Sequence, residues 1–162
     1  MVSLARTGVT QYATPNDREV VVTRVFAAPR RLVFDAYTTP THLQKWLLGP
    51  ADWTMTVCEI DTRPGGAWRY TWRKPGGAEM TLWGVVREFV PPERIVMTEN
   101  WGGDWPESLN TVVFTESNGH TTITLTITYP DKAARDAAMA TGMEDGMEVS
   151  FARLDALLST LV

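Results

Sequence analysis

The sequence has 162 residues, a length that suits one domain built around a single hydrophobic core. Its composition, 44% hydrophobic and 21% charged, is that of a folded globular protein and argues against an intrinsically disordered chain. The net charge is −4 and the Lys and Arg residues are scattered among acids, so we expect no nucleic-acid partner.

The first 18 residues show little periodicity, and we predict a flexible lead-in that could contain a short ordered piece. Residues 19–162 are expected to form one folded domain. The lead-in lacks the apolar run of a signal peptide, and no stretch approaches the roughly 18 apolar residues of a membrane span. We therefore expect a cytoplasmic protein with no integral membrane contact.

The first predicted elements are one strand and two short helices. The β-branched run over 19–26 predicts a strand that stops at Pro29. Apolar residues at helical spacing predict a helix over 30–37. Pro40 suits the first turn of a second helix that runs to about Trp46 and ends before residues 49–50.

Six further strands are predicted over 54–61, 67–73, 80–90, 94–100, 111–116 and 121–129. Turns rich in Gly, Pro and Asn separate them, so neighbouring strands should pair antiparallel as a meander. The last strand alternates threonine with apolar residues, which indicates one solvent-facing side and one buried side.

The end of the chain predicts two helices. Asp131 can cap a helix that runs to about Thr141, and Gly142 can interrupt it. A longer amphipathic helix follows, with an apolar stripe that should fill the concave face of the sheet. The predicted fold class is α+β: a seven-stranded curved antiparallel sheet around a long C-terminal helix, with two short helices between the first and second strands.

Several short motifs in a fixed order resemble a known family. They are Thr23 to Pro29, Val33-Phe34, Ala36, Leu43 to Trp46, Gly49-Pro50, Asp61 to Trp68, Gly84, Pro91 to Ile95, Thr98-Glu99 and Thr141 to Glu144. Together the motifs resemble the START-like (SRPBCC) superfamily, in particular bacterial homologues of the activator of the heat-shock-ninety ATPase. The resemblance covers residues 19–162 and implies the helix-grip fold, also called birch-pollen-allergen-like.

The resemblance also implies a cavity between the curved sheet and the C-terminal helix. Members of the superfamily use this cavity for lipids, polyketides, hormones or other apolar ligands. Where a member is an enzyme, its chemistry comes from polar groups placed in the cavity. The bacterial members that look like this chain are mostly small domains without an assigned activity, so chaperone activation is only weakly implied.

Aromatic and methionine side chains are the candidate ligand-binding residues, because such side chains line permissive apolar sites. Strand alternation places three large rings on one face of the strand over 67–73. An ordinary aromatic core would explain the same pattern. The full candidate set is Trp46, Trp68, Tyr70, Trp72, Trp83, Glu99, Trp101, Met143, Met147 and Phe151.

Catalytic and metal-binding patterns are weak in this sequence. A buried carboxylate at Glu99, paired with Arg24 or Tyr70, could act as an acid or base, but surface acids explain the pattern as well. Cys58 is interpreted as an inert buried thiol and cannot form an intramolecular disulfide, because it is the only cysteine. We assign no catalytic residue, no metal site and no cofactor.

We therefore predict a binding protein for a small apolar or aromatic molecule, without assigned catalysis. One alternative is a cyclase, dehydratase or hydrolase acting on such a ligand. Another is a protein-interaction module, either a chaperone partner or a homodimer that uses aromatic surface between Trp101 and Trp105. Gly146, inside the long helix, is interpreted as a close helix-to-strand contact in preference to a ligand contact.

Overall fold

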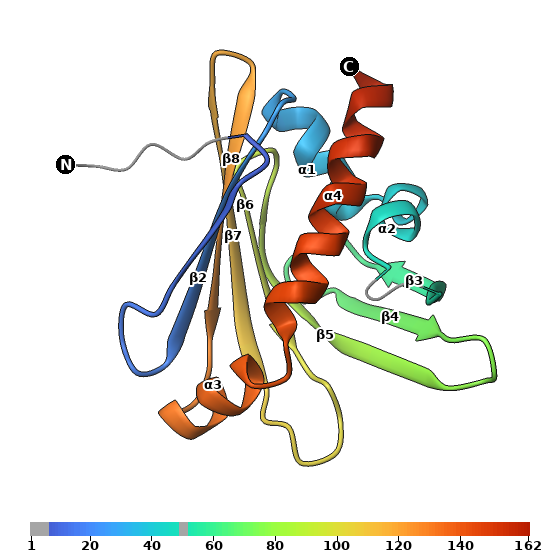
Figure 1. Cartoon of the computed structure of the whole chain (residues 1–162), viewed down its shortest axis with the longest axis vertical. Coiled ribbons are helices and arrows are strands. Elements are labelled where there is room, and N and C mark those ends of the chain that lie inside the picture. The colour runs from blue at the N-terminus through green and yellow to red at the C-terminus, as the bar shows by residue number, and fades with distance from the viewer. Residues whose placement is uncertain (1–6, 49–51) are drawn as a thin grey trace.

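The computed structural model describes residues 7–48 and 52–162 and shows a curved antiparallel sheet wrapped around a long C-terminal helix (Figure 1). The eight strands lie in the order β1-β2-β8-β7-β6-β5-β4-β3, and every pair of neighbours is antiparallel. Their bounds are Thr10–Ala13 (β1), Glu19–Phe26 (β2), Thr54–Ile60 (β3), Ala67–Arg73 (β4), Glu79–Val90 (β5), Arg94–Glu99 (β6), Ser108–Ser117 (β7) and His120–Thr128 (β8).

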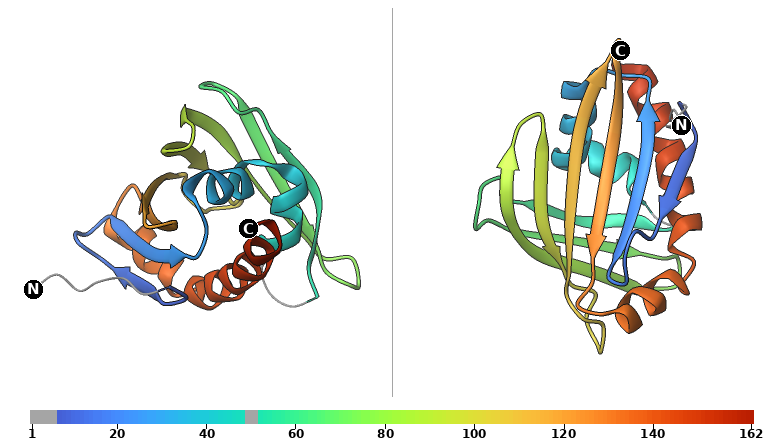
Figure 2. Two further views of the ribbon diagram at one scale, coloured as in Figure 1. Left: turned by 90° about the horizontal axis from the view of Figure 1, so that it is seen from above. Right: turned by 90° about the vertical axis from the view of Figure 1, so that its left-hand side faces the viewer.

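Four helices complete the fold, and they lie on the concave side or at one end of the sheet. Seen from above, α4 lies between the two wings of the sheet, with β1 and β2 on one side and β3 and β4 on the other (Figure 2). The helices are α1 (Arg30–Thr38), α2 (Pro40–Trp46), α3 (Lys132–Met139) and α4 (Met143–Leu161). Among the described residues, no helix is long and apolar enough to cross a membrane.

The expected α+β fold is confirmed, but the strand count is eight instead of seven. The additional strand, β1, lies within the expected lead-in and pairs with β2, with Tyr12 opposite Val22. The β7 strand also begins three residues earlier than predicted, at Ser108. Both differences arise where short polar segments acquire strand geometry from a neighbouring strand and not from their own pattern.

The long helix is held in place by an apolar stripe and a buried ion pair. Phe151, Leu154 and Leu158 are buried on the side that faces the sheet. The Arg24 guanidinium, on β2, donates to both carboxylate oxygens of Asp155 at 3.1 and 2.8 Å. This pair fixes the middle of α4 against β2.

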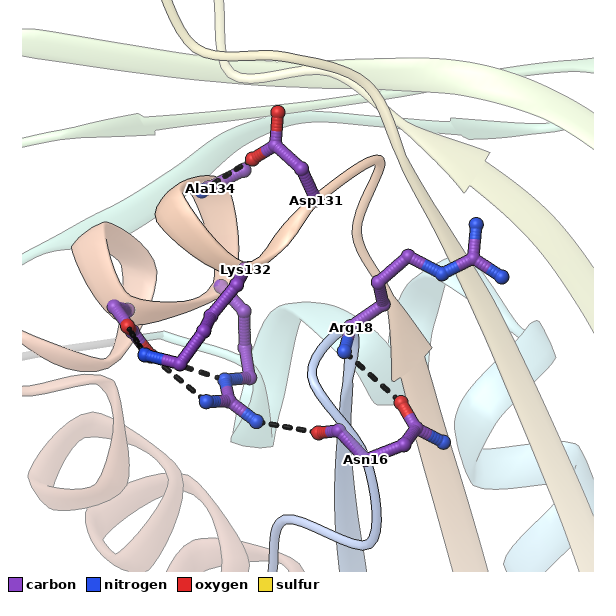
Figure 3. A network of polar contacts seen from close by, with 7 residues as sticks. Asn16, Arg18, Asp131, Lys132 and Ala134 are labelled. Atoms are coloured by element: carbon purple, nitrogen blue, oxygen red, sulfur yellow. Dashed lines mark hydrogen bonds and ion pairs between the residues drawn. The ribbon is translucent and has the colours of Figure 1, made fainter.

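A polar network connects α3 to the turn between β1 and β2 (Figure 3). As predicted, Asp131 caps α3, accepting from the Ala134 backbone amide at 2.8 Å. The buried Arg135 donates to the Asn16 carbonyl and to the Asp136 carboxylate. The network therefore anchors the helix that leads into α4.

Candidate functional site

Part of the sheet's inner face, the face turned toward α4, is not sealed by the helix. In the middle of this face Val22, Val86 and Ile123 have no exposed surface. Nearer the start of α4, inner-face side chains are only half-buried; these are Met97, Glu99, Asn110, Leu125 and Tyr129. Their accessible surface marks this end of the inner face as the candidate site.

Five residues form what we call the inner site: Tyr70, Glu99, Asn110, Tyr129 and Met143. The antiparallel register brings the strands together, because Glu99 of β6 lies opposite Ser108 of β7, and Asn110 follows two residues later on the same face. The Tyr129 hydroxyl lies 4.0 Å from the Met143 sulfur, which closes the site with the first residue of α4.

The central contact of the inner site is a hydrogen bond from the Asn110 Nδ2 to the Glu99 carboxylate. Protein surrounds Glu99 closely although part of its side chain is accessible, as expected for a group that lines an internal space. This burial raises the pKa of the Glu99 carboxyl, and the hydrogen bond from Asn110 opposes the rise. The rise in pKa favours the protonated form of Glu99, which both donates and accepts hydrogen bonds.

Two tyrosine hydroxyls lie within electrostatic reach of Glu99. Burial is the main cause that raises the pKa of Tyr70, followed by Cys58 and Glu99. Burial, and then Glu99, raises the pKa of Tyr129 to about 12. Both groups therefore remain neutral phenols at physiological pH and can donate a hydrogen bond.

The Trp68 indole forms a wall beside Glu99, and a glycine makes room for it. Its Nε1 donates to the Thr98 carbonyl at 2.9 Å, across the neighbouring strand β5. A Cβ atom at Gly84 would lie 1.9 Å from the Thr98 carbonyl oxygen and 2.7 Å from the Trp68 Nε1. Only glycine fits at this position without displacing the backbone or the indole.

The other buried tryptophans of the candidate set are part of the core. The Trp46 and Trp72 indoles donate to the carbonyls of Ala36 and Leu47 at 2.8 and 2.7 Å. Phe151 is also buried, with its ring edge-on to Phe26 at 5.7 Å. Because their polar atoms already have protein partners, these residues shape the fold and leave little free hydrogen-bonding capacity for a ligand.

Two residues of the candidate set lie away from the inner face. Trp83 faces outward from β5 and is 42% exposed, and Trp101 follows β6 and is 47% exposed. The structure thus brings Tyr70, Glu99 and Met143 to the inner site and separates Trp83 and Trp101 from them, while Met147 is half-buried against the core.

Sequence reasoning did not select Asn110 or Tyr129 for the site. For Tyr129 a signal existed, because alternation placed it on the buried face of the last strand. Asn110 offered none, since it precedes the predicted start of its strand at residue 111.

One polar pair that the sequence offered for Glu99, the pair with Arg24, is not formed. Arg24 does not pair with Glu99, because it binds Asp155 instead. The two residues also lie far apart along the sheet: Arg24 is paired with Ile123, whereas Glu99 lies beside the row that contains Tyr129. Six residues of strand separate those rows, roughly 20 Å.

The expected close contact at Gly146 is also wrong. A Cβ atom at this position would meet nothing within 4 Å. Gly146 lies one helical turn after Met143 and one turn before the buried Ser150, at the border of the inward stripe of α4. There is thus room for a side chain at Gly146, beside the first turns of α4.

Cys58 has the expected character of an inert thiol. It is half-buried, lies opposite Tyr70 in the β3–β4 pairing, and burial raises its pKa to about 11. In the described part of the chain, no cluster of three or more His, Cys, Asp or Glu residues could hold a metal ion. The chemistry that the inner site offers is therefore hydrogen bonding beside apolar surface.

A hollow of about 800 Å³ lies beside α3. Its lining includes Asn16, Arg18, Glu19, Asp131 and Lys132, of which all but Glu19 are labelled in Figure 3. These side chains are polar or charged, so the hollow does not suit the apolar ligand predicted from the sequence.

Comparison with known proteins places the chain among related structures. Residues 27–159 match a family model described as "Activator of Hsp90 ATPase homolog 1-like protein". A crystal structure from Rhodobacter sphaeroides is 30% identical, with a TM-score of 0.88, covering 95% of this chain and 100% of that one. Protein Ms6760 from Mycobacterium smegmatis is 27% identical, with a TM-score of 0.81 and coverages of 92% and 96%.

A more distant likeness supports the fold. The AHSA1-like protein from Aeromonas hydrophila is 17% identical, with a TM-score of 0.69, covering 85% of this chain and 93% of that chain. No curated protein matches this sequence.

Proposed function

The chain belongs to the family of activator of Hsp90 ATPase homolog 1-like proteins, and from this premise we propose that it binds a small apolar or aromatic molecule between the sheet and α4. The observation that carries the proposal is the half-buried end of the inner face. Folded cores are close-packed, yet Met97, Leu125 and Met147 here retain accessible surface, and a side chain added at Gly146 of α4 would have open space around it.

The residues around this space suit an apolar molecule with one polar end. Methionine side chains from β6 and α4 supply an adaptable apolar surface. The few polar groups, Glu99, Asn110 and Tyr70, lie together at one side. Apolar walls with a small number of grouped polar atoms are typical of small-molecule sites.

Equilibrium dialysis with 2-naphthol tests the proposal, because this probe combines an aromatic body with one hydroxyl. We expect saturable binding at one site per chain. Gly146→Leu should weaken binding at least tenfold by filling the open space, while helix propensity favours leucine over glycine. Ala152→Leu, at an exposed position of the same helix, is the matched control and should bind as the wild type does. Absence of saturable binding by the wild type would overturn the proposal.

One observation favours the alternative of an enzyme acting on such a ligand. Glu99 is a buried carboxyl group with a raised pKa, the property expected of a general acid. Native mass spectrometry of the wild type and Glu99→Gln, each purified from its source cells, separates the two functions. A binding protein should retain the same molecule in both forms, whereas an enzyme should retain a different, unconverted molecule when Glu99 is replaced.

A further inference from the structure

We infer that the molecule bound in the inner site carries a hydroxyl group, which donates a hydrogen bond to the Oδ1 atom of Asn110. The inference rests on the proposed function and deepens it, since it defines the polar end of the ligand. Within the described ranges, Asn110 Oδ1 is buried and has no hydrogen-bond partner. Burying an amide oxygen without a partner is costly, so native proteins nearly always satisfy such atoms.

The orientation of the Asn110 amide is set by its neighbour. Its Nδ2 donates to Glu99, which leaves Oδ1 as the free end of the group. An oxygen can only accept, so the group that completes this contact must be a donor. The apolar Met97 and Ile127 flank Asn110 on the inner face as its cross-strand partners, and neither provides one.

Glu99 and Tyr70 favour a hydroxyl group on the ligand over a ligand group that can donate a hydrogen bond but cannot accept one. A neutral Glu99 accepts from Asn110 through one oxygen and can donate through its other oxygen. The Tyr70 hydroxyl, which lies within electrostatic reach of Glu99, is a second donor. A ligand hydroxyl can donate to Asn110 and accept from one of these groups, whereas an ammonium group could donate to Asn110 but could not accept from either.

Two probes of similar size and shape test this inference. The hydroxyl of 2-naphthol donates and accepts, whereas the ether oxygen of 2-methoxynaphthalene only accepts. We expect the wild type to bind 2-naphthol about tenfold more tightly at pH 6.5, because its hydroxyl gives Asn110 Oδ1 a hydrogen bond that the ether cannot give. Equilibrium dialysis of both probes measures this ratio, and the wild-type comparison needs no variant.

Two variants test whether Asn110 causes the preference for 2-naphthol over 2-methoxynaphthalene. Asn110→Leu should lower the ratio to within about twofold of one, because the acceptor is gone and the apolar volume is kept. Asn118→Gly, in the exposed β7–β8 turn, is the control and should keep the wild-type ratio. A ratio that stays near tenfold in Asn110→Leu would overturn the role of Asn110.

The remaining outcomes separate the inference from the proposed function. Equal binding of both probes by the wild type would overturn the inference and leave the proposed function standing. It would indicate that protonated Glu99 itself donates to Asn110 Oδ1. Failure of both probes to bind would overturn the proposed function, and the inference with it.

Discussion

The ion pair between Arg24 and Asp155 should respond unequally to the removal of its two partners. The Arg24 side chain is 4% exposed, and its guanidinium also donates to the Phe151 carbonyl at 3.1 Å. The rings of Phe26 and Phe151 lie 4.8 and 5.3 Å from its central carbon. The Asp155 side chain is 38% exposed and stays in contact with water.

This difference in exposure sets the expected free energies. Asp155→Ala leaves a buried cation without its partner charge, and we expect it to lower the free energy of unfolding by about 3 to 5 kcal/mol. Arg24→Met removes the buried charge, keeps most of the apolar stem and leaves Asp155 free to hydrate. Its cost should be about 1 to 2 kcal/mol, close to the value of the lost hydrogen bonds.

Urea unfolding at pH 7, followed by tryptophan fluorescence and circular dichroism, measures both values. Asp61→Ala is the matched control, because Asp61 pairs with Arg63 at 2.8 Å in a turn where both side chains are exposed. Its effect should stay within about 0.5 kcal/mol. If Arg24→Met destabilises the chain as much as Asp155→Ala, burial of the cation does not control the energetics and the reasoning is refuted.

Three further predictions concern the inner site and its wall. Gly84→Ala should lower the unfolding free energy in urea by about 3 kcal/mol or more, because the new methyl group would overlap the Thr98 carbonyl; a change below 1 kcal/mol would contradict this. Burial raises the pKa of Glu99 above 4.5, so the folded chain binds more protons at this residue than the unfolded chain does. The free energy of unfolding should therefore fall as the pH rises from 4.5 through the pKa of Glu99 in the folded chain. Urea unfolding across this pH range should show that Glu99→Gln removes this fall and that Glu59→Gln, at an exposed site, keeps it. Cys58, with its pKa raised from 9.0 to about 11, should react with a disulfide reagent at pH 8 about 100-fold more slowly than in the urea-unfolded chain, and equal rates would show an exposed thiol.

The parts of the fold with strong local patterns could be predicted from the sequence. Alternation over 121–129 identified the buried face of β8, where Ile123 has no exposed surface. The stripe through Phe151, Leu154 and Leu158 identified the face of α4 that packs on the core. In both cases the side-chain period follows from the element itself, so no knowledge of its partners was required.

β1 could not be predicted because its geometry comes from its partner. Only four residues long, it holds its place by pairing with β2 at the edge of the sheet. Tyr12 also reaches across to α4, where its hydroxyl donates to Glu148 at 2.8 Å. Contacts more than 130 residues away in the sequence leave no signal in a four-residue pattern.

The candidate site was predicted in part, because strand parity shows which way a side chain points but not what it meets. Trp68, Tyr70 and Trp72 share the inner face as expected. The indoles of Trp68 and Trp72 donate hydrogen bonds to the backbone carbonyls of Thr98 and Leu47, which lie on distant segments. These bonds give both tryptophans a structural role. No feature of the strand over 67–73 contains that information.

Whether a buried polar atom has a hydrogen-bond partner therefore distinguishes the ligand-facing groups from the core more sharply than residue type does. The buried indoles have partners for every N–H, whereas Asn110 Oδ1 has none within the described part of the chain. Three other buried polar atoms of the described residues also lack a partner, Thr10 Oγ1, Arg24 Nε and His42 Nδ1, but Asn110 Oδ1 is the one that lies beside Glu99 and the half-buried Met97. That place is where a small hydroxylated ligand would complete the structure, which is why Asn110 and not a tryptophan is the residue to replace first.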